Sequence, residues 1–307
     1  MNKAANLSKP GTNLLQRSNI DVEKTEWIEW YENDFIMVHN PVFRFGYRCP
    51  YRLGQVVVVI CDEGTASGSI NLKSYDLKKN NMLVVLADHI IEAYEVSADF
   101  KGTYIFMSPS FLSKLNIGDG YKFYESIERE PCFQLEDRMA DSVRSYVDMC
   151  HTMMQLSDQN PNTAESLQLL SRLFFLNLGW FLHHDAIEQA SHSQASNVTE
   201  QFLAFVKAHY KVHREVEYYA GLMHMTPKYM STLVKSASGK SALKWIEEYV
   251  ILEAKTQLAS TLNAIQQIAY DLNFPTQSFF GRYFKRATGM SPLAYRNLVR
   301  LSCNISK

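Results

Sequence analysis

The sequence has no apolar run long enough to cross a bilayer. Its longest strongly apolar stretches, VVVVI at residues 56–60 and MLVVLA at 82–87, fall far short of the roughly 20 residues of a membrane helix. The first 20 residues also lack the apolar core of a secretory signal peptide. We therefore expect no membrane partner, a cytoplasmic chain, and buried strands at both stretches.

Patterns that would hold a metal or drive catalysis are also missing. None of the five cysteines belongs to a C-x-x-C pair, which favours a reducing compartment over disulfides or a zinc finger. Residues 25–132 contain no His-x-His sequence and only two histidines, His39 and His89. Neither a G-x-S-x-G motif nor a phosphate-binding loop occurs. The sequence thus predicts no metal, no cofactor and no enzymatic activity.

The nearly neutral total charge hides a strong division along the chain. Residues 199–307 contain fourteen Lys/Arg against seven Asp/Glu, a net charge of +7. The first 198 residues hold the remaining seventeen Lys/Arg against twenty-five Asp/Glu, a net charge of −8. An acidic body with a basic C-terminal third points to a polyanionic partner for that third.

Short apolar runs separated by turn residues fill the N-terminal part. Residues 1–20 are polar and are predicted to be a disordered tail. The segment 21–135 is rich in Val, Ile, Tyr and Phe, with Asp, Asn and Gly between the runs. This pattern is typical of antiparallel strands and predicts a small β-barrel or sandwich.

A pair of helices is expected at residues 136–184. In the first, apolar residues recur every three to four positions; the second, after the break at 160–163, is apolar nearly all round. Such a helix is buried on several sides. We expect a hairpin whose surplus apolar face meets a partner subunit, with burial wholly within one chain as the alternative. Residues 185–198, poor in bulky apolar side chains, are predicted to be a linker.

An internal repeat occupies the C-terminal third. Ala220 corresponds to Ala269 at an offset of 49, whereas Met230 corresponds to Phe280 at an offset of 50. One residue inserted in the second turn explains the change. Each copy is predicted to be a helix, a tight turn and a second helix, with Thr226 and Thr276 as N-caps and glycines at the C-terminal ends. A continuous helix over 242–260 joins the copies.

This arrangement resembles the double helix-turn-helix DNA-binding domain of the AraC/XylS family of transcription regulators. The resemblance rests on Thr226-Pro227-Lys228-Tyr229-Met230-Ser231, on the Phe-x-x-x-Phe-Lys pattern of 280–285, and on Gly289-Met290-Ser291-Pro292 followed by Tyr295-Arg296. It covers about 199–300. Two positions depart from the family pattern: Val234 stands where phenylalanine is usual, and Pro275 stands where a small polar residue is usual. More loosely, residues 21–135 resemble the cupin-like effector domains of the same family.

In a helix-turn-helix the second helix enters the major groove. The residues predicted to contact bases are those facing outward on the two second helices: Lys228, Ser231, Thr232, Gln277, Ser278 and Arg282. Arg282 has the donors to pair with guanine, and Gln277 can pair with adenine; Lys228 suits either a guanine or a phosphate. The resemblance also implies base contact at Lys228, Thr232, Gln277 and Arg282. The cations predicted to neutralise phosphates are Lys235, Lys240, Lys285, Arg286 and Arg296.

Together these features predict an α+β chain: an antiparallel barrel or sandwich with a helical hairpin, then an all-α domain at 199–307. We expect a sequence-specific, homodimeric regulator that binds double-stranded DNA and responds to a small-molecule effector, whose contact residues the sequence does not define. RNA polymerase is a further candidate partner. The alternatives are an N-terminal domain that binds a partner protein, or an enzyme fused to a DNA-binding domain.

Overall fold

The computed structural model of the chain describes residues 20, 22–25, 27–42, 50–117, 126–188 and 194–304. Nearly all of the predicted tail, residues 1–19, lies outside these residues. Apart from residues 50 and 51, the described residues divide into an N-terminal unit that ends with residue 188 and a C-terminal unit that begins after it. All of the described strands belong to two sheets.

The two sheets are built from short strands. The six-stranded sheet has the order β1 (Trp27–Tyr31), β2 (Phe35–His39), β9 (Lys101–Met107), β4 (Val56–Glu63), β7 (Asn81–Val85) and β10 (Cys132–Gln134). The four-stranded sheet has the order β3 (Tyr51–Arg52), β8 (Ile90–Val96), β5 (Ala66–Ile70) and β6 (Lys73–Leu77). The strand pairs with a defined register are antiparallel. The predicted antiparallel β architecture is confirmed.

Strand β4 explains why its sequence is apolar throughout instead of alternating. Val56, Val58 and Ile60 belong to the main core cluster. Val57 and Val59 point to the opposite face of the sheet and are buried as well. A strand that is covered on both faces has no position for a polar residue, and β4 is accordingly central in its sheet.

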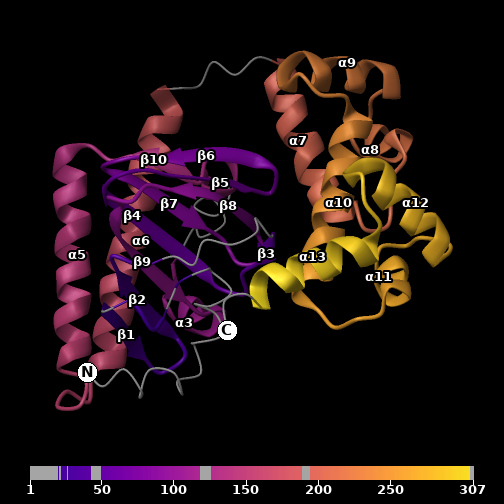
Figure 1. Ribbon diagram of the computed structural model, residues 1–307. Helices are drawn as coiled ribbons and strands as arrows, with labels where there is room; N and C mark the ends of the chain where they lie inside the picture. Colours follow the sequence, from indigo (N-terminus) through magenta and orange to yellow (C-terminus); the bar gives the residue numbers. More distant parts are fainter. Residues whose placement is uncertain are drawn as a thin grey trace. The chain divides into compact units, whose positions relative to one another are not determined.

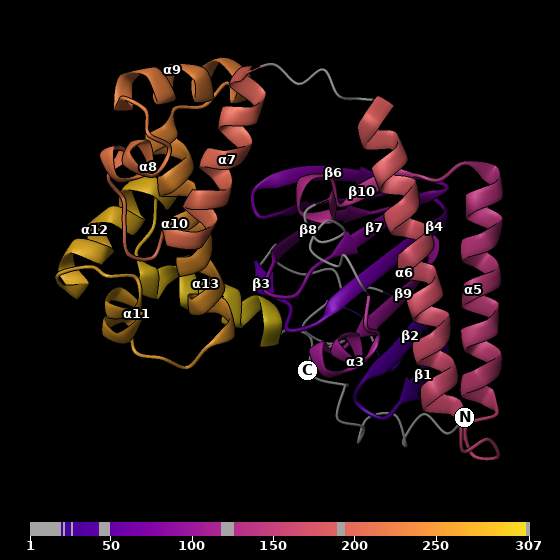
Figure 2. The same ribbon diagram turned by 180° about the vertical axis from the view of Figure 1, so that it is seen from behind.

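Two long helices form the predicted hairpin, α5 (Asp137–Gln155) and α6 (Thr163–Glu188). They lie side by side along one face of the six-stranded sheet (Figures 1 and 2). Val143 and Cys150 of α5 and Phe175 of α6 share one core cluster with residues of the sheet. Tyr146 stacks on Phe174 at a ring distance of 4.6 Å and joins the two helices. A short helix, α3 (Pro109–Lys114), follows β9.

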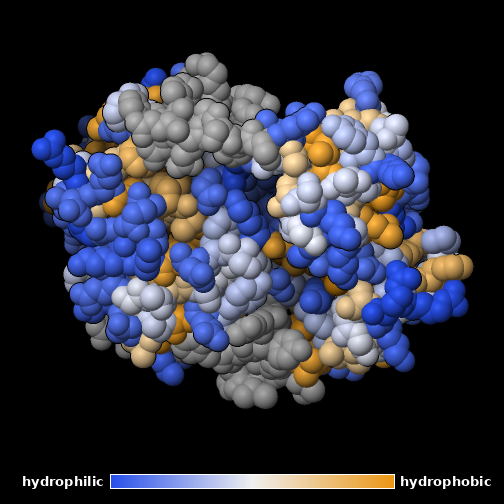
Figure 3. Space-filling view, turned by 90° about the horizontal axis from the view of Figure 1, so that it is seen from above, coloured by the Kyte–Doolittle hydropathy of each residue, from blue (hydrophilic) through white to orange (hydrophobic). Residues whose placement is uncertain are grey.

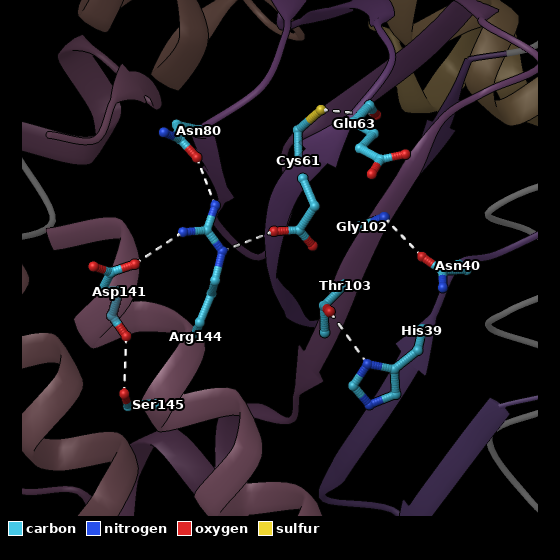
Figure 4. A network of polar contacts seen from close by, with 11 residues as sticks. His39, Asn40, Cys61, Glu63, Asn80, Gly102, Thr103, Asp141, Arg144 and Ser145 are labelled. Atoms are coloured by element: carbon cyan, nitrogen blue, oxygen red, sulfur yellow. Dashed lines mark hydrogen bonds and ion pairs between the residues drawn. The ribbon is translucent and has the colours of Figure 1, made fainter. Parts of the chain in front are cut away.

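Arg144 fastens α5 to the sheet. Its guanidinium donates to Asn80 Oδ1 at 2.6 Å and to Asp62 Oδ1 at 3.3 Å, and it also contacts Asp141 one turn earlier (Figure 4). The planar guanidinium carries five donors, so one side chain can serve several acceptors at once. The network links the first half of α5 to β4 and to the turn before β7.

The predicted linker at 185–198 is wrong in extent. Helix α6 continues to Glu188, and α7 (Gln194–His209) already begins at Gln194. Although this stretch lacks bulky apolar residues, it contains Ala, Glu and Gln, which are good helix formers. Low hydrophobicity was therefore a poor indicator of the helix ends.

The C-terminal unit is helical in its described part. Its helices are α7, α8 (Val216–Leu222), α9 (Pro227–Ser238), α10 (Ala242–Ser260), α11 (Ile265–Asp271), α12 (Gln277–Thr288) and α13 (Pro292–Asn304). On the face of the molecule in Figure 3, hydrophilic residues predominate and hydrophobic ones gather in small patches. None of the described helices is both long enough and apolar enough to cross a membrane.

Candidate nucleic-acid interface

Helices α8 and α9 form one helix-turn-helix, and α11 and α12 form the other. Their turns are equivalent in detail. Met225 N donates to Ala220 O at 2.9 Å, and Phe274 N donates to Ala269 O at 2.8 Å. His224 and Asn273, which precede the two donors, both have a φ of 53°. The internal repeat seen in the sequence is thus a repeat in structure.

The extra residue in the second copy is Pro275. The offset of 49 holds up to Phe274, whereas the caps Thr226 and Thr276 are 50 residues apart. Thr226 accepts a hydrogen bond from Tyr229 N, and Thr276 accepts one from Phe279 N, both at 3.3 Å. The predicted cap of α12 is therefore confirmed despite the proline before it. A threonine cap stabilises its helix by about 1 kcal/mol.

Both second helices end at a glycine that needs its conformational freedom. Gly239 has a φ of 74° and Gly289 a φ of 81°, in the left-handed region. In each case the glycine N–H bonds the carbonyl four residues earlier, Lys235 or Lys285. A side chain at either position would strain this ending.

The inner faces of α9 and α12 are apolar and buried. Met230 and Val234 are fully buried on α9, as are Phe280 and Phe284 on α12. Phe274, in the preceding turn, packs on Phe280 at a ring distance of 5.3 Å. These contacts hold the helices to their own domain and fix which residues face outward.

The residues predicted to contact bases all lie on the outward faces. Lys228, Thr232, Gln277, Ser278 and Arg282 are exposed, and Ser231 is partly exposed. Thr232 donates its hydroxyl proton to Lys228 O at 2.8 Å, within its own helix. The Arg282 guanidinium lies over the ring of Phe279, 4.6 Å from its centroid.

Four of the five predicted phosphate-binding cations are exposed: Lys235, Lys240, Lys285 and Arg286. Lys240 pairs with Glu248 at 2.8 Å. Arg286 pairs with Glu247 at 3.2 Å and so links α12 to α10. Burial raises the pKa of the Glu247 carboxyl, but Lys244 and Arg286 lower it by more, so it lies below its usual value.

Arg296, the fifth cation predicted to bind phosphate, differs from the other four because it is buried. Only 8% of the residue is exposed, and its Nη2 donates to Asn263 O at 2.7 Å. Burial and the nearby Arg300 both lower the pKa of its guanidinium. The internal repeat also indicates burial at this position, because the equivalent residue 50 positions earlier, Ile246, is apolar and buried. Arg296 faces inward on α13 and fastens the loop before α11.

Sequence reasoning also missed the role of Arg214. Its guanidinium donates to the carbonyl oxygens of Leu272 and Asn273, and it stacks on the Phe274 ring at 3.9 Å. In return, Asn273 Nδ2 donates to Val212 O at 3.1 Å. The loop before α8 is thereby tied to the turn before α12. No local sequence motif marks such a contact, because its partners are about 60 residues apart.

The outward faces also contain two exposed aromatic residues and one glycine that has free space beside it. Tyr229 and Phe279, which are equivalent in the repeat, are 46% and 53% exposed. Gly281 lies in the middle of α12, and a Cβ built there meets nothing within 4 Å. Glycine within a helix costs about 0.5–1 kcal/mol relative to alanine. Packing inside the domain therefore does not require this glycine.

Comparison with known proteins agrees with this geometry. A family model described as a helix-turn-helix domain matches residues 219–298. The chain is 32% identical over 107 residues to the HTH-type transcriptional regulator YobQ of Bacillus subtilis, covering 35% of this chain and 42% of that protein. It is 27% identical over 113 residues to the arabinose operon regulatory protein of Escherichia coli, covering 36% and 39%.

The chain thus spans less than half the length of these curated relatives. Among solved structures, ToxT of Vibrio cholerae is 14% identical, covers 87% of this chain and 99% of its own, and has a TM-score of 0.39.

Proposed function

We propose that this chain is a sequence-specific DNA-binding transcription regulator of the AraC type, because its C-terminal third matches a helix-turn-helix domain and is similar to the arabinose operon regulatory protein. The observation that carries the proposal is the pair of equivalent recognition helices, α9 and α12, each with a buried apolar face and a polar, cationic outward face. Equivalent threonine caps begin both helices, so equivalent positions of α9 and α12 face outward.

We assign base recognition mainly to α12. Arg282 offers a bidentate donor pair to guanine, and Gln277 and Ser278 stand in the first turn, which enters the groove first. Phe279 supports the Arg282 guanidinium and offers an apolar edge to a thymine methyl group. At Gly281, the missing side chain leaves room for the DNA to come close to the helix. A glycine that weakens its own helix is explained if a partner needs that space.

Helix α9 supplies the second set of contacts through Lys228, Ser231 and Thr232. The cations Lys235, Lys240, Lys285 and Arg286 give affinity by neutralising phosphates. With both helices on one face of the duplex, they would read successive major grooves about 34 Å apart.

The proposal is tested by selecting bound DNA from a random-sequence pool with the full chain. We expect an enriched motif of two short elements with centres about 10–10.5 base pairs apart. Binding to the selected site should exceed binding to unrelated DNA by about 10³-fold or more at physiological salt. Equal binding to both DNAs would contradict sequence-specific recognition.

We further propose that the chain is a dimer formed through α6. Its exposed apolar residues are Leu169, Leu173, Leu176 and Trp180, between 47% and 70% exposed. Their spacings of four, three and four residues match a coiled-coil seam. The exposure of these side chains favours a partner subunit over the alternative of burial wholly within one chain.

The dimer proposal is tested by light scattering coupled to size exclusion. Leu173→Glu should convert a dimer into a monomer, because a charge would be buried in the seam. The matched control is Leu243→Glu, since Leu243 on α10 is 60% exposed and lies outside α6. A wild-type monomer, or a dimer insensitive to Leu173→Glu, would overturn the proposal.

We assign signal reception to the two-sheet N-terminal unit, with a small molecule as the signal. Support comes from the division of the chain into two units, one of which contains the proposed DNA-reading surface. A ligand that binds only the folded chain raises its melting temperature by mass action. Metabolite fractions that raise it and change DNA affinity would support a small-molecule effector. A response only to a protein fraction would favour the partner-protein alternative.

A regulator of this kind acts on chromosomal DNA in the cytoplasm, and its proposed activity requires no catalysis. RNA polymerase stays a predicted partner.

A further inference from the structure

Three side chains with metal-binding chemistry meet in the N-terminal unit, which does not contain the proposed recognition helices. Glu29 lies on β1, His39 on β2 and His151 on α5. His151 Nδ1 is 2.7 Å from Glu29 Oε1, and His39 Nε2 is 3.7 Å from Glu29 Oε2. One ligand atom from each residue can be chosen so that all three lie within 4.8 Å of one another. No local sequence pattern marks this cluster, because its members come from a strand pair and from a helix more than 100 residues later.

Three polar atoms of this cluster are buried and lack a hydrogen bond of acceptable geometry. Glu29 is only 6% exposed. Its Oε2 atom makes no hydrogen bond, and neither His39 Nε2 nor His151 Nδ1 makes one of acceptable geometry. A buried carboxylate oxygen without a partner is strongly unfavourable, and native proteins rarely contain one. Glu29 Oε2, His39 Nε2 and His151 Nδ1 face one another, so a single bound cation would serve all three.

The surrounding side chains orient the ligand atoms as outer-shell partners do in metal sites. Thr103 Oγ1 is 3.2 Å from His39 Nδ1, and Figure 4 shows the other ring nitrogen of His39 turned away from Thr103. If Nδ1 is the protonated nitrogen, Nε2 offers its lone pair to the cluster. Gln155, one turn after His151, donates to Glu29 Oε1 at 2.7 Å and leaves Oε2 available.

The charge and the geometry both suit a divalent cation. The Glu29 carboxylate supplies one negative charge, and each neutral imidazole supplies one nitrogen lone pair. Ligand atoms around a tetrahedral zinc ion are about 3.4 Å apart, given metal–ligand distances of about 2.0–2.2 Å. In the cluster, one ligand atom from each residue lies within 4.8 Å of the other two, which is wider than that spacing. Small rotations of the side chains would complete the site.

We propose that Glu29, His39 and His151 bind a divalent transition-metal ion of the zinc class, with solvent in the remaining coordination position. Two imidazoles and one carboxylate are a ligand set that zinc accepts. Because the ligands come from β1, β2 and α5, the ion would cross-link the helical hairpin to the edge of the six-stranded sheet. The proposal is independent of DNA recognition, which uses the other unit.

The test uses the untagged full chain, stripped of metal with a chelator, and measures Zn²⁺ binding by competition with a chromophoric chelator. We expect one tightly bound ion per chain and a rise in melting temperature when zinc is added. His151→Gln should weaken binding by about 100-fold or more, since loss of an outer-shell partner alone costs about 10- to 100-fold. His151 is a third exposed on a helix surface, so this variant should fold.

Two controls make the result specific. His209→Gln removes a histidine from α7 in the other unit and should leave zinc affinity unchanged. Trp27 stacks on His151 at a ring distance of 5.7 Å and also contacts His39, so Co²⁺ should quench its fluorescence. Trp27→Phe should abolish most of that quenching while zinc still binds.

Absence of stoichiometric binding, or equal affinity in wild type and folded His151→Gln, would overturn the proposal. In that case Glu29, His39 and His151 form a purely ionic cluster between α5 and the sheet.

Discussion

Helices α9 and α12 start at equivalent threonine caps and end at equivalent left-handed glycines, yet their outward residues differ. Where α9 has Ser231 and Thr232, α12 has Gly281 and Arg282. The Thr232 hydroxyl is bonded within its own helix, whereas Arg282 projects from the surface over Phe279. The caps and the buried face thus determine which positions face outward in both helices. The residues at those outward positions differ between α9 and α12. We infer that α12 carries more of the sequence discrimination.

The largest expected effect comes from Arg282→Ala. Loss of a bidentate guanine contact should reduce affinity for the selected site by about 1–3 kcal/mol, and should relax specificity at one base position. Thr232→Ala, its equivalent on α9, should cost less than about 1 kcal/mol, because it removes mainly a methyl contact. Fluorescence anisotropy on matched and single-mismatch duplexes measures both. Equal losses in the two variants would break the proposed division between the helices.

The variant Arg296→Ala tests whether this residue stabilises the fold or binds DNA. Arg296→Ala should lower the free energy of unfolding by about 1.5 kcal/mol, because it removes a charged donor and leaves Asn263 O without it. The salt dependence of DNA affinity should stay unchanged. Urea unfolding and binding at several salt concentrations check the two statements. A shallower salt dependence would return Arg296 to the phosphate-binding set.

Lys285→Gln and its equivalent Lys235→Gln test whether the copies share phosphate contacts. Each should weaken binding to all sequences alike and reduce the slope of log affinity against log salt by about 0.9, the value for one phosphate contact. The free energy of unfolding should hardly change, since both side chains are exposed. If only one variant alters the slope, the two copies do not lie on DNA equivalently.

The smallest effects are expected at Gly281, where one substitution should raise stability and lower DNA affinity. Gly281→Ala should stabilise the domain by about 0.5–1 kcal/mol, because the new methyl group meets open space in a helix. The same methyl group should weaken DNA binding if the duplex approaches α12 there. Gly221→Ala is the control, since Gly221 lies in α8 and is also open. It should change DNA affinity little. Unaltered affinity in Gly281→Ala would remove the argument for close approach.

The predictability of the two units differs for physical reasons. In the C-terminal unit, caps, C-terminal glycines and apolar positions can be recognised from neighbouring residues. Because the motif occurs twice, each copy supports the interpretation of the other. The same comparison, applied to Ile246, would have indicated that Arg296 is buried. In the N-terminal unit, strand runs were recognisable, but their pairing order and the Arg144 network depend on contacts between distant segments.

Contacts between distant segments also explain why the roles of Arg214 and His151 could not be predicted from the sequence. Arg214 meets the turn of the second copy, and His151 meets β1, only after folding. The end of α6 was misplaced because helix propensity at 185–188 outweighed the lack of apolar residues. Local patterns therefore located the recognition helices, and the fold supplied the contacts that position them.

The most direct test of the account repeats the random-sequence selection with wild type, Arg282→Ala and Thr232→Ala in parallel. The account predicts a two-element motif for wild type. Arg282→Ala should lose a guanine preference in one element and keep the other, and Thr232→Ala should keep the first and soften the second. A wild-type pool without an enriched motif, or an identical motif from all three proteins, would contradict sequence reading by α9 and α12.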